Sequence, residues 1–540
     1  MPDFSSLTRY STFAGVIVLA VLSLFSMFIW SGWFILPLLV FGALSLLGLH
    51  DVRQTAHSIL RNYPVLGHLR FLFEQMRPEL RQYLIEADQD EVPFSRDARS
   101  LVYQRAKGQE DARPFGTRMR VYDAGYSWVT HSVQPTHIED TDFRIKIGGK
   151  NCAKPYSASI YNISAMSFGA LSANAISALN MGAAKGGFAH DTGEGGISIY
   201  HRQAGGDLIY EIGSGYFGCR TEDGQFSPEK FAEQAARDQV KMIEVKLSQG
   251  AKPGHGGMLP AAKITKEISD ARGVPMGFDC VSPASHSAFS TPIEMMHFLG
   301  QLRELSGGKP VGFKLCIGHQ REFMCIVKAM LETGIIPDFI VVDGTEGGTG
   351  AAPLEFANHV GMPMVEALTF VHNTLRGAGI RDQVKLGAAG KIISAFDIAR
   401  ALALGADWCN SARGFMFAIG CIQAQACHTN HCPVGVATQD PLRSKALDPL
   451  HKSERVARFH RNTLKALGEM TGAAGLSHPI DFLPHHLMQR QSDRSMVQGN
   501  QAFPYLPEGF LVDDKAADHM GYKERWSRAR AETFNPPAEL

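Results

Sequence analysis

The sequence predicts an α/β protein: a (β/α)8 barrel of the TIM type, preceded by an N-terminal transmembrane helical hairpin. Residues 13–49 contain no Asp, Glu, Lys, Arg or His, which predicts the hairpin. Between residues 158 and 416, short apolar runs alternate with amphipathic stretches, as they do where parallel strands alternate with helices. Eight strand–helix units in roughly 250 residues fit a closed barrel. An open doubly wound sheet is the alternative, although no strand here leads into a GxGxxG turn.

The balanced charge of the chain argues against nucleic acid as a partner. Its 540 residues include 53 Lys and Arg against 53 Asp and Glu, and 45% of them are hydrophobic. Proteins that grip DNA or anionic lipid over a broad surface carry an excess of basic residues. The composition also excludes a disordered chain, so a sizeable core is expected.

The uncharged N-terminal stretch falls into two apolar halves, parted by Ser31 and Gly32. Each half has about 17 or 18 residues and, as a helix, is roughly 26 Å long, close to the thickness of a bilayer core. Trp30 and Trp33 flank the turn, as aromatic residues do at a membrane interface. Because arginines precede and follow the hairpin, we expect it in the cytoplasmic membrane with the catalytic domain in the cytoplasm. A cleaved signal peptide is the alternative, but a second apolar segment follows at once.

We expect four segments along the chain: the hairpin at 1–50, a connector and N-terminal cap at 51–150, the barrel at 151–480 and a C-terminal tail at 481–540. The predicted barrel strands are 158–165, 186–190, 242–248, 276–279, 311–317, 338–344, 384–390 and 406–412. Helices are predicted at 172–185, 260–272, 291–305, 322–334 and 394–405. In such a barrel the chemistry lies at the C-terminal ends of the strands.

The loops after the last three predicted strands are rich in glycine and indicate a phosphate site. Glycines let a backbone approach a ligand closely, and many barrels place a phosphate behind their last two strands. Tight turns without a ligand are the alternative. The residues concerned are Asp343, Gly347, Gly348, Thr349 and Gly350 after the sixth strand, Gly390 and Lys391 after the seventh, and Arg413 and Gly414 after the eighth.

Basic side chains gather at the ends of the middle strands. Lys246 and Ser248 lie two residues apart on the third predicted strand and share a face, and Lys314 has a similar position on the fifth. A lysine in a barrel mouth needs an anionic partner, which the N1/O2 edge of a reduced flavin would supply. Lys252 on the next loop and Arg272 at the end of the following helix would hold a small dicarboxylate. For any one of these side chains, a solvated loop end is the alternative.

Three of the nine cysteines lie close together in the sequence: Cys421, Cys427 and Cys432, with Pro433 directly after them. Their spacing matches neither a zinc ribbon nor a thioredoxin motif. It would suit an iron–sulfur cluster, whereas buried thiols without a ligand are the alternative. The other cysteines are scattered without the rhythm of a disulfide scaffold, which fits a reducing compartment.

Several motifs together resemble the FMN-binding synthase domain of glutamate synthase. The likeness extends from about Arg113 to about Leu476. It implies an FMN barrel with a 3Fe-4S cluster, in which reduced FMN delivers hydride to 2-iminoglutarate formed from 2-oxoglutarate and ammonia. The motifs are SAMSFGALS, DTGEGG, KLSQGAKPGHGG, EGGTGAAP and, most specific of all, GCIQAQACHTNHCPVGVATQ.

The resemblance also implies roles for individual residues, beginning with the flavin. Ala165, Met166 and Ser167 would line the flavin ring, and Lys246 would meet its N1/O2 edge. The glycines of the last loops would hold the phosphate. Ser248, Lys314 and Asp343 complete the set of residues expected around the cofactor.

For the substrate and the cluster, the resemblance implies a second set. Lys252 and Arg272 would bind 2-oxoglutarate, with Glu194 beside the point where ammonia enters. Together with Lys246 these are the expected catalytic residues. The three cysteines Cys421, Cys427 and Cys432 would ligate iron.

The chain also departs from the family's pattern. A glutaminase domain usually begins the large subunit and a membrane hairpin takes its place here, so ammonia would be free or come from a separate glutaminase. Met258 stands where the family has Gln, and His255 where it often has Glu, which affects the 2-oxo acid that fits. No nicotinamide or FAD domain is expected, so electrons would come from ferredoxin, a reductase subunit or a membrane donor.

We therefore expect a membrane-anchored FMN and iron–sulfur oxidoreductase that reductively aminates a 2-oxo acid, with 2-oxoglutarate and glutamate as the obvious pair. Use of an alkylamine, as in N-methylglutamate synthase-like relatives, is the alternative within the enzyme class. The alternative outside it is a membrane-tethered electron-transfer subunit that needs a partner's active site.

Overall fold

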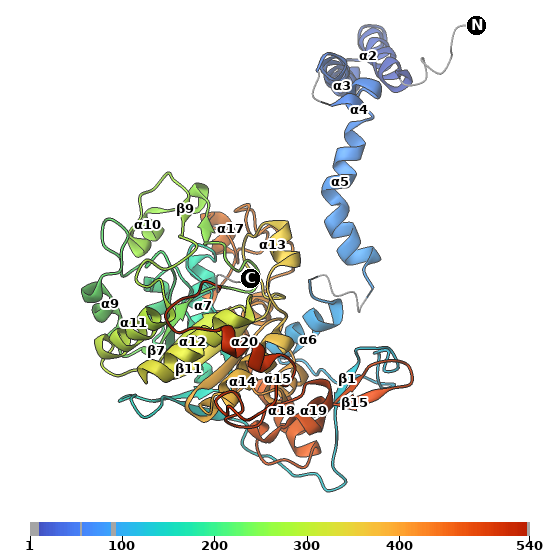
Figure 1. Cartoon of the computed structure of the whole chain (residues 1–540). Helices are drawn as coiled ribbons and strands as arrows, with labels where there is room; N and C mark the ends of the chain where they lie inside the picture. Colours follow the sequence, from blue (N-terminus) through green and yellow to red (C-terminus); the bar gives the residue numbers. More distant parts are fainter. Residues whose placement is uncertain (1–9, 55–56, 88–92, 537–540) are drawn as a thin grey trace. The chain divides into compact units, whose positions relative to one another are not determined.

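The structure, a computed structural model, describes residues 10–54, 57–87 and 93–536 (Figure 1). It divides into two compact units, Met1–Asp90 and Glu91–Leu540. The first contains the hairpin and the helices that follow it. The second contains the barrel and every segment that packs on it, the predicted C-terminal tail included.

The hairpin consists of α2 (Ser11–Ile29) and α3 (Ile35–Arg53), joined by the short helical turn η1 (Gly32–Phe34). The two helices are antiparallel and in close contact, because a Cβ atom on Gly48 in α3 would lie 2.3 Å from the ring of Phe13 in α2. Mean hydropathies of 2.5 over Ser11–Ile29 and 2.1 over Gly32–Arg53 make both helices long and apolar enough to cross a membrane. The predicted helical hairpin is thus present, and its helices are candidate spans by length and composition, the test that a signal sequence also passes.

Three short elements follow in the first unit: α4 (Ser58–Asn62), α5 (His68–Leu80) and η2 (Arg81–Ile85). Asp51, near the end of α3, is completely buried and fastens α5 in place. Its carboxylate accepts a hydrogen bond of 2.9 Å from the backbone N–H of Val65, and His68 Nε2 lies 2.9 and 3.0 Å from its two oxygens.

Eight parallel strands of the second unit close into a barrel, which confirms the predicted fold class. β13 pairs with β4, with Asn410 opposite Asn162, so the sheet has no free edge and the open doubly wound sheet is excluded. The strands are buried on both faces, as in other parallel barrels. In order around the barrel they are β4 (Tyr161–Ile163), β5 (His190–Asp191), β6 (Leu208–Ile212), β7 (Val240–Lys246), β10 (Val311–Leu315), β11 (Phe339–Asp343), β12 (Lys385–Ala389) and β13 (Trp408–Ser411).

One predicted barrel strand is wrong and one was missed. Residues 276–279 form no strand; next to them β9 (Cys280–Val281) pairs with β8 (Met258–Leu259) in a small ribbon outside the barrel. The apolar side chains of the wrong strand lie at the surface, with Phe278 70% exposed. The missed strand is β6, whose apolar run carries a buried glutamate, and it makes residues 242–248 the fourth barrel strand rather than the third.

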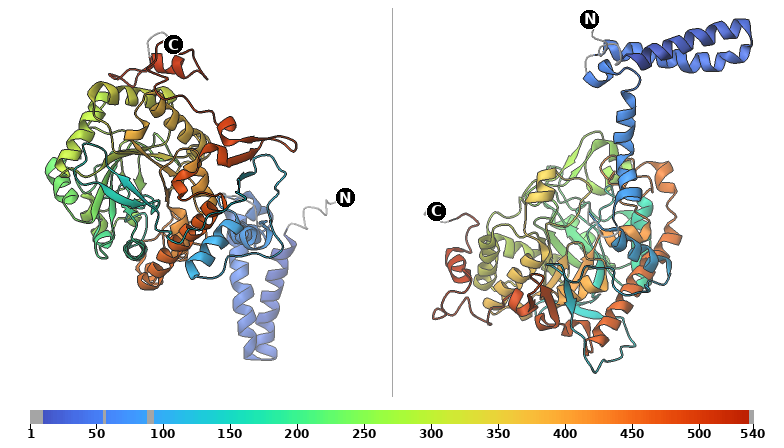
Figure 2. Two further views of the ribbon diagram at one scale, coloured as in Figure 1. Left: turned by 90° about the horizontal axis from the view of Figure 1, so that it is seen from below. Right: turned by 90° about the vertical axis from the view of Figure 1, so that its right-hand side faces the viewer.

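Helices cover the outside of the barrel, as Figure 2 shows. Their ends follow local signals: Ser172 Oγ accepts a hydrogen bond from Ala175 N at the start of α7, and Gly187, with φ at +66°, ends it. Four of the five predicted helices are present, whereas 260–272 is divided into η3 (Ala261–Lys263) and α10 (Lys266–Arg272). The helices around the barrel are α7 (Ala173–Gly186), α8 (Ile199–Arg202), α9 (Pro228–Ala235), α11 (Pro292–Leu305), α12 (Gln320–Thr333), α14 (Met364–Gly377), α15 (Ala395–Ala403), α16 (Arg413–Ile419) and α18 (Pro449–Ala473).

Segments before and after the barrel pack back onto it. The C-terminal segment, red in Figure 1, is fixed to α12, where Arg321 Nη1 donates a hydrogen bond of 3.1 Å to Asn535 O. β2 and β3 form an antiparallel pair, and β1 joins β14 and β15 in a three-stranded sheet. The bounds are α6 (Arg96–Lys107), β1 (Ser127–Val129), β2 (Arg144–Ile147), β3 (Tyr156–Ser159), α13 (Leu354–His359), η4 (Arg381–Gln383), α17 (Pro441–Lys445), η5 (Pro479–Asp481), η6 (Pro484–His486), β14 (Leu487–Arg490), β15 (Met496–Gln498), α19 (Gly499–Ala502) and α20 (Tyr522–Arg528).

Candidate functional site

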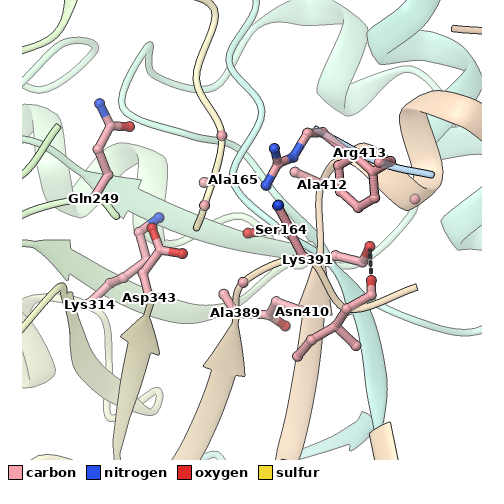
Figure 3. A pocket seen from close by; sticks show the side chains of 17 residues that line it. Ser164, Ala165, Gln249, Lys314, Asp343, Ala389, Lys391, Asn410, Ala412 and Arg413 are labelled. Atoms are coloured by element: carbon pink, nitrogen blue, oxygen red, sulfur yellow. Dashed lines mark hydrogen bonds between the residues drawn. The ribbon is translucent and has the colours of Figure 1, made fainter. Parts of the chain in front are cut away.

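An open cavity lies at the C-terminal ends of the barrel strands (Figure 3). Its volume is about 510 Å³, with the solvent-filled mouth included. This is the end of the barrel where the sequence places the chemistry. The predicted cofactor residues that line the cavity are Ala165, Lys314, Asp343, Gly347, Gly348, Gly390, Lys391, Arg413 and Gly414.

Two cations mark one side of this cavity. Arg413 and Lys391 reach toward the same space (Figure 3), and both lie against the ring of Phe94, at 4.6 Å for Arg413 Cζ and 5.9 Å for Lys391 Nζ. Arg413 Nη2 also donates a hydrogen bond of 2.7 Å to Glu346 O. Burial lowers the pKa of Arg413 to about 10, so its charge is costly unless an anion meets it. The pair is placed to receive a phosphate.

Glycines make room for these cations. A Cβ atom on Gly348 would lie 2.7 Å from Arg413 Nε, a distance that real Cβ atoms essentially never show. Gly390 has φ at +147° and Lys391 has φ at +49°, so the loop after β12 turns through the left-handed region twice in succession. These conformations expose the backbone at the cavity, as a phosphate-binding loop requires.

Lys314 and Asp343 define the opposite side of the cavity (Figure 3). Asp343 Oδ2 accepts a hydrogen bond of 2.8 Å from Gly250 N, which joins the loop after β7 to the end of β11. This approach depends on glycine, because a Cβ atom on Gly250 would lie 1.7 Å from Gly344 O. Burial raises the pKa of Asp343, while the ammonium of Lys314 opposes that rise.

A second, smaller cavity adjoins the first, and Gln249 lines both. Glu194, Lys246, Ser248 and His255 are among its other lining residues. Lys246 Nζ lies 3.2 Å from Glu194 Oε2 and 3.3 Å from Gln249 Oε1, so its charge stands at the boundary between the two cavities.

Three cations surround the carboxylate of Glu194. Burial favours its neutral form, but Lys246, Arg272 and Lys252 together hold the pKa of Glu194 below its ordinary value. Lys252 and Arg272 are 3% and 4% exposed, and neither has a carboxylate of the described residues within ion-pair distance. The group therefore carries surplus positive charge in a buried place, which favours binding of an anion.

Several predicted residues lie outside the wall of the first cavity. Thr349 and Gly350 are exposed beyond Gly348, and Met166 and Ser167 follow Ala165 without lining either cavity. Lys246 and Ser248 line the second cavity instead, where Ser248 Oγ accepts a hydrogen bond of 2.9 Å from Cys316 N. Arg272 is held by Phe168 O, 3.2 Å from its Nη2.

The structure also brings in residues that sequence reasoning missed. Gln249 was overlooked although it stands between two predicted residues, Ser248 and Lys252, on the loop after β7. Asn410 was overlooked at the end of the last predicted strand, a position that the barrel rule does single out. Phe94 carried no signal, because it comes from a distant segment before α6.

The three clustered cysteines lie on the loop after α16. Burial raises the pKa of Cys421 to about 12 and also raises that of Cys427, with the neighbouring cysteines adding to both effects. Deprotonation of these thiols therefore needs a group that stabilises thiolates, such as a metal ion or a cluster.

Two further features of this loop fit an anionic cluster. Lys263, 3% exposed, has no carboxylate partner among the described residues; its Nζ donates to Cys427 O at 2.8 Å and to Ala437 O at 3.3 Å. Thiolates would supply the missing negative charge. Gln423, Gln425 and Asn430 all have positive φ, strain that costs about 1–3 kcal/mol each and gathers at functional sites.

Comparisons with known proteins bear on the family of this chain. A family model described as a conserved region in glutamate synthase matches residues 130–477. A glutamate synthase large subunit-like protein, YerD, from Bacillus subtilis is 39% identical over 83% of this chain and 92% of its own length. An archaeal-type NADPH glutamate synthase from Thermotoga neapolitana is 35% identical over 58% of this chain, which spans only 59% of that relative's length. A solved mutant flavocytochrome b2 with pyruvate bound matches with a TM-score of 0.42 and 12% identity, over 84% of this chain and 92% of its own.

Proposed function

This chain belongs to the glutamate synthase family, and from that premise we propose that it is a membrane-anchored FMN and iron–sulfur enzyme that reductively aminates a 2-oxo acid. The family resemblance predicted from the motifs is thereby confirmed. The proposed substrate is 2-oxoglutarate, with ammonia as the amine and glutamate as the product. An electron donor, such as ferredoxin or a reductase subunit, would be the partner.

The first cavity fits FMN. Arg413 and Lys391 would bind the phosphate, together with backbone N–H groups around Gly390 and Gly414. Lys314, on the opposite side, and Lys246, at the boundary with the second cavity, would face the edge of the flavin that gains negative charge. When bound, FMN supplies the hydride that the reaction requires.

The residues of the cysteine loop would suit an iron–sulfur cluster, which when bound would supply electron transfer. Cys421, Cys427 and Cys432 would ligate it, as the family resemblance implies, and the buried ammonium of Lys263 would balance its charge. The hairpin would anchor the chain, because arginines flank its helices on the side expected in the cytoplasm.

The three cations around Glu194 are the observation that supports 2-oxoglutarate as the substrate. With Glu194 ionised, the group has a surplus of two positive charges, which matches the two carboxylates of 2-oxoglutarate. Arg272 offers a planar fork for one carboxylate, and Lys252 a point charge for the other. Glu194 itself would attract ammonium, and Gln249 would keep the amination next to the flavin.

Anaerobic reoxidation tests this proposal. Full-length protein carrying its cofactors would be photoreduced and mixed with a 2-oxo acid and either ammonium or methylamine. We expect 2-oxoglutarate with ammonium to restore the absorption of oxidised flavin and to yield glutamate; restoration with methylamine alone would favour the alkylamine reaction. If no pair of 2-oxo acid and amine reoxidises the flavin, the aminating function is wrong.

A matched pair of lysine variants locates the substrate site. Lys252→Met should raise the KM for 2-oxoglutarate at least tenfold, because a charge-assisted hydrogen bond is worth about 1.5–3 kcal/mol. Lys266→Met changes an exposed lysine that pairs with Asp270 on the surface, and should leave the KM unchanged. Equal KM values for the two variants would exclude Lys252 from the substrate site.

A further inference from the structure

A group of acidic side chains lies among neighbouring barrel strands, next to the first cavity. Asp191 on β5, Glu211 on β6 and Glu244 on β7 hold carboxylate oxygens within 4.8 Å of one another. None of the three is more than 1% exposed. Lys314 on β10, 3% exposed, contacts them: its Nζ is bonded to Glu211 Oε2 and lies 3.5 Å from Glu244 Oε1. We call these three carboxyl groups the acid cluster.

The acid cluster has fewer positive charges than negative ones. Three carboxylates face one ammonium, and leaving a buried carboxylate unpaired costs several kcal/mol. Glu211 and Glu244 are directly opposed in the register of β6 and β7, where like charges repel. Asp343 adds a further acidic group that interacts with Lys314 and Glu211, and Lys246 is a further cation that acts on Asp343. A fully ionised acid cluster is therefore unfavourable.

Protons bound to the carboxyl groups would relieve this repulsion. Both side-chain oxygens of Glu244 and Oδ2 of Asp191 are buried and have no hydrogen-bond partner among the described residues. A proton on one carboxyl would donate a hydrogen bond to its neighbour and remove a negative charge. Burial raises the pKa of Glu244, and it raises the pKa of Asp191 to about 7. The acid cluster thus holds a proton near neutral pH.

Lys314 connects the acid cluster to the first cavity. The same ammonium that holds the carboxylates also lines the cavity, beside Asp343. A negative charge that arrives in the cavity would attract this ammonium and reduce its effect on the carboxylates. Their affinity for protons would then rise, and by linkage the bound proton would favour the arriving charge.

We propose that Asp191, Glu211 and Glu244 form a proton-binding site, which takes up a further proton when negative charge arrives in the cavity beside Lys314. The inference rests on the proposed binding of FMN, because a flavin that gains two electrons and one proton carries one extra negative charge. The electron donor supplies two electrons to the flavin, one at a time. One proton goes to the flavin, and one proton from solvent goes to a carboxylate of the acid cluster. The barrel core then undergoes no net change of charge.

Potentiometry on the full-length protein with FMN bound tests this proposal. The pH dependence of the flavin midpoint potential between about pH 6 and 8 counts the protons taken up per two electrons. We expect two protons in the wild type and one in Glu244→Gln, which keeps the shape of the side chain but cannot bind the proton. Asp191→Asn should also give one, and it provides the measurement if Glu244→Gln does not fold. Glu304→Gln, an exposed change on α11, should keep two.

Infrared difference spectra on reduction give a second readout, which does not depend on turnover. The wild type should gain the carbonyl band of a protonated carboxyl, shifted in D2O, and Glu244→Gln should lack it. If the wild type and Glu244→Gln take up one proton each and neither gains the band, the acid cluster is not a proton-binding site. Failure to bind FMN at all would instead contradict the proposed function, so the two failures are distinguishable.

Discussion

Lys246 Nζ lies 3.2 Å from Glu194 Oε2, in an ion pair that joins the loop after β5 to the end of β7. The fit is tight, because a Cβ atom on Gly257 would lie 1.9 Å from Glu194 Oε1. The backbone therefore holds the carboxylate in place, and Lys246, Lys252 and Arg272 hold it ionised. Once an anionic substrate balances the surplus positive charge of the three cations, this carboxylate would be placed to accept a hydrogen bond from ammonium.

Glu194→Gln should separate the binding of the 2-oxo acid from its amination. The change removes the negative charge among the three cations, so 2-oxoglutarate should bind more tightly. Turnover with ammonium should fall at least roughly 10²-fold, because Glu194 would also accept the proton that ammonium must lose before it attacks. Titration of the flavin spectrum gives the Kd, and anaerobic reoxidation gives the rate. An unchanged rate would exclude Glu194 from the reaction.

Gly348→Ala should weaken FMN binding, because the new methyl group would meet Arg413 Nε at 2.7 Å and displace the guanidinium. Overpacking of this kind costs about 1–3 kcal/mol, or roughly fivefold to 150-fold in Kd. Gly350→Ala is the matched control, since a Cβ atom there would have no neighbour within 4 Å. Fluorescence titration of FMN-depleted protein measures both affinities, and equal values for the two variants would contradict the role of Arg413.

Cys427→Ser should remove iron while leaving the flavin. The thiolate is the ligand, and serine does not replace it in a cluster held by three cysteines. Metal analysis should show the loss, together with loss of the broad visible absorption, whereas the flavin peaks persist. Cys152→Ser, a change outside the cysteine loop, should retain the iron. Unchanged iron in Cys427→Ser would end the cluster assignment.

The barrel strands and loops were predictable wherever a short stretch of sequence determines the local structure. Apolar runs such as Phe339–Asp343 are buried on both faces and stand out against the helices between them. β6 was missed because Glu211 interrupts its apolar run, and a glutamate is unexpected in a buried strand. The position of Glu211 in the acid cluster accounts for a glutamate in this strand. The cluster joins three strands, and no local sequence pattern connects them.

The candidate site, like the fold, was predictable only in part. Glycine-rich loops behind Ala389 and Ser411 were predictable, because the barrel fold places them at one end whatever the sequence between them. The sequence did not predict how the basic residues are divided between the two cavities. Lys246 and Lys314 lie opposite each other on adjacent strands, yet Lys246 lines the second cavity and Lys314 lines the first. Side-chain direction at a strand end decides this, and spacing alone does not give it.

Two truncations should differ in solubility. Deletion through residue 49 leaves α5, whose Leu69, Leu72 and Phe73 are 47%, 48% and 59% exposed. Deletion through residue 90 removes the whole first unit. We expect the longer deletion to give more soluble protein that still binds FMN, because it also removes the exposed apolar side chains of α5. Size-exclusion chromatography of both forms, with flavin absorption monitored, checks this; equal solubility would show that the hairpin alone retains the chain at membranes.

His460 should make the stability of the second unit depend on pH. The ring is 3% exposed, lies between Ser159 Oγ at 2.9 Å and Tyr161 O at 3.0 Å, and stacks on Phe188. Burial lowers its pKa to about 3, whereas the unfolded chain binds that proton near pH 6.5. The stability that the neutral ring contributes is therefore complete above about pH 6.5 and is lost as the pH falls toward the folded pKa, by about 1.4 kcal/mol per unit.

His460→Asn should reduce that slope. The variant should melt at a lower temperature than the wild type at pH 8, since it loses the packed ring, yet its melting temperature should fall less steeply between about pH 6.5 and 4.5. It should keep some slope, because burial also lowers the pKa of His190, His201, His286 and His372. His451→Asn, an exposed change on the same helix, should run parallel to the wild type. Parallel curves for His460→Asn and the wild type would mean that the buried ring is not the source of the acid sensitivity.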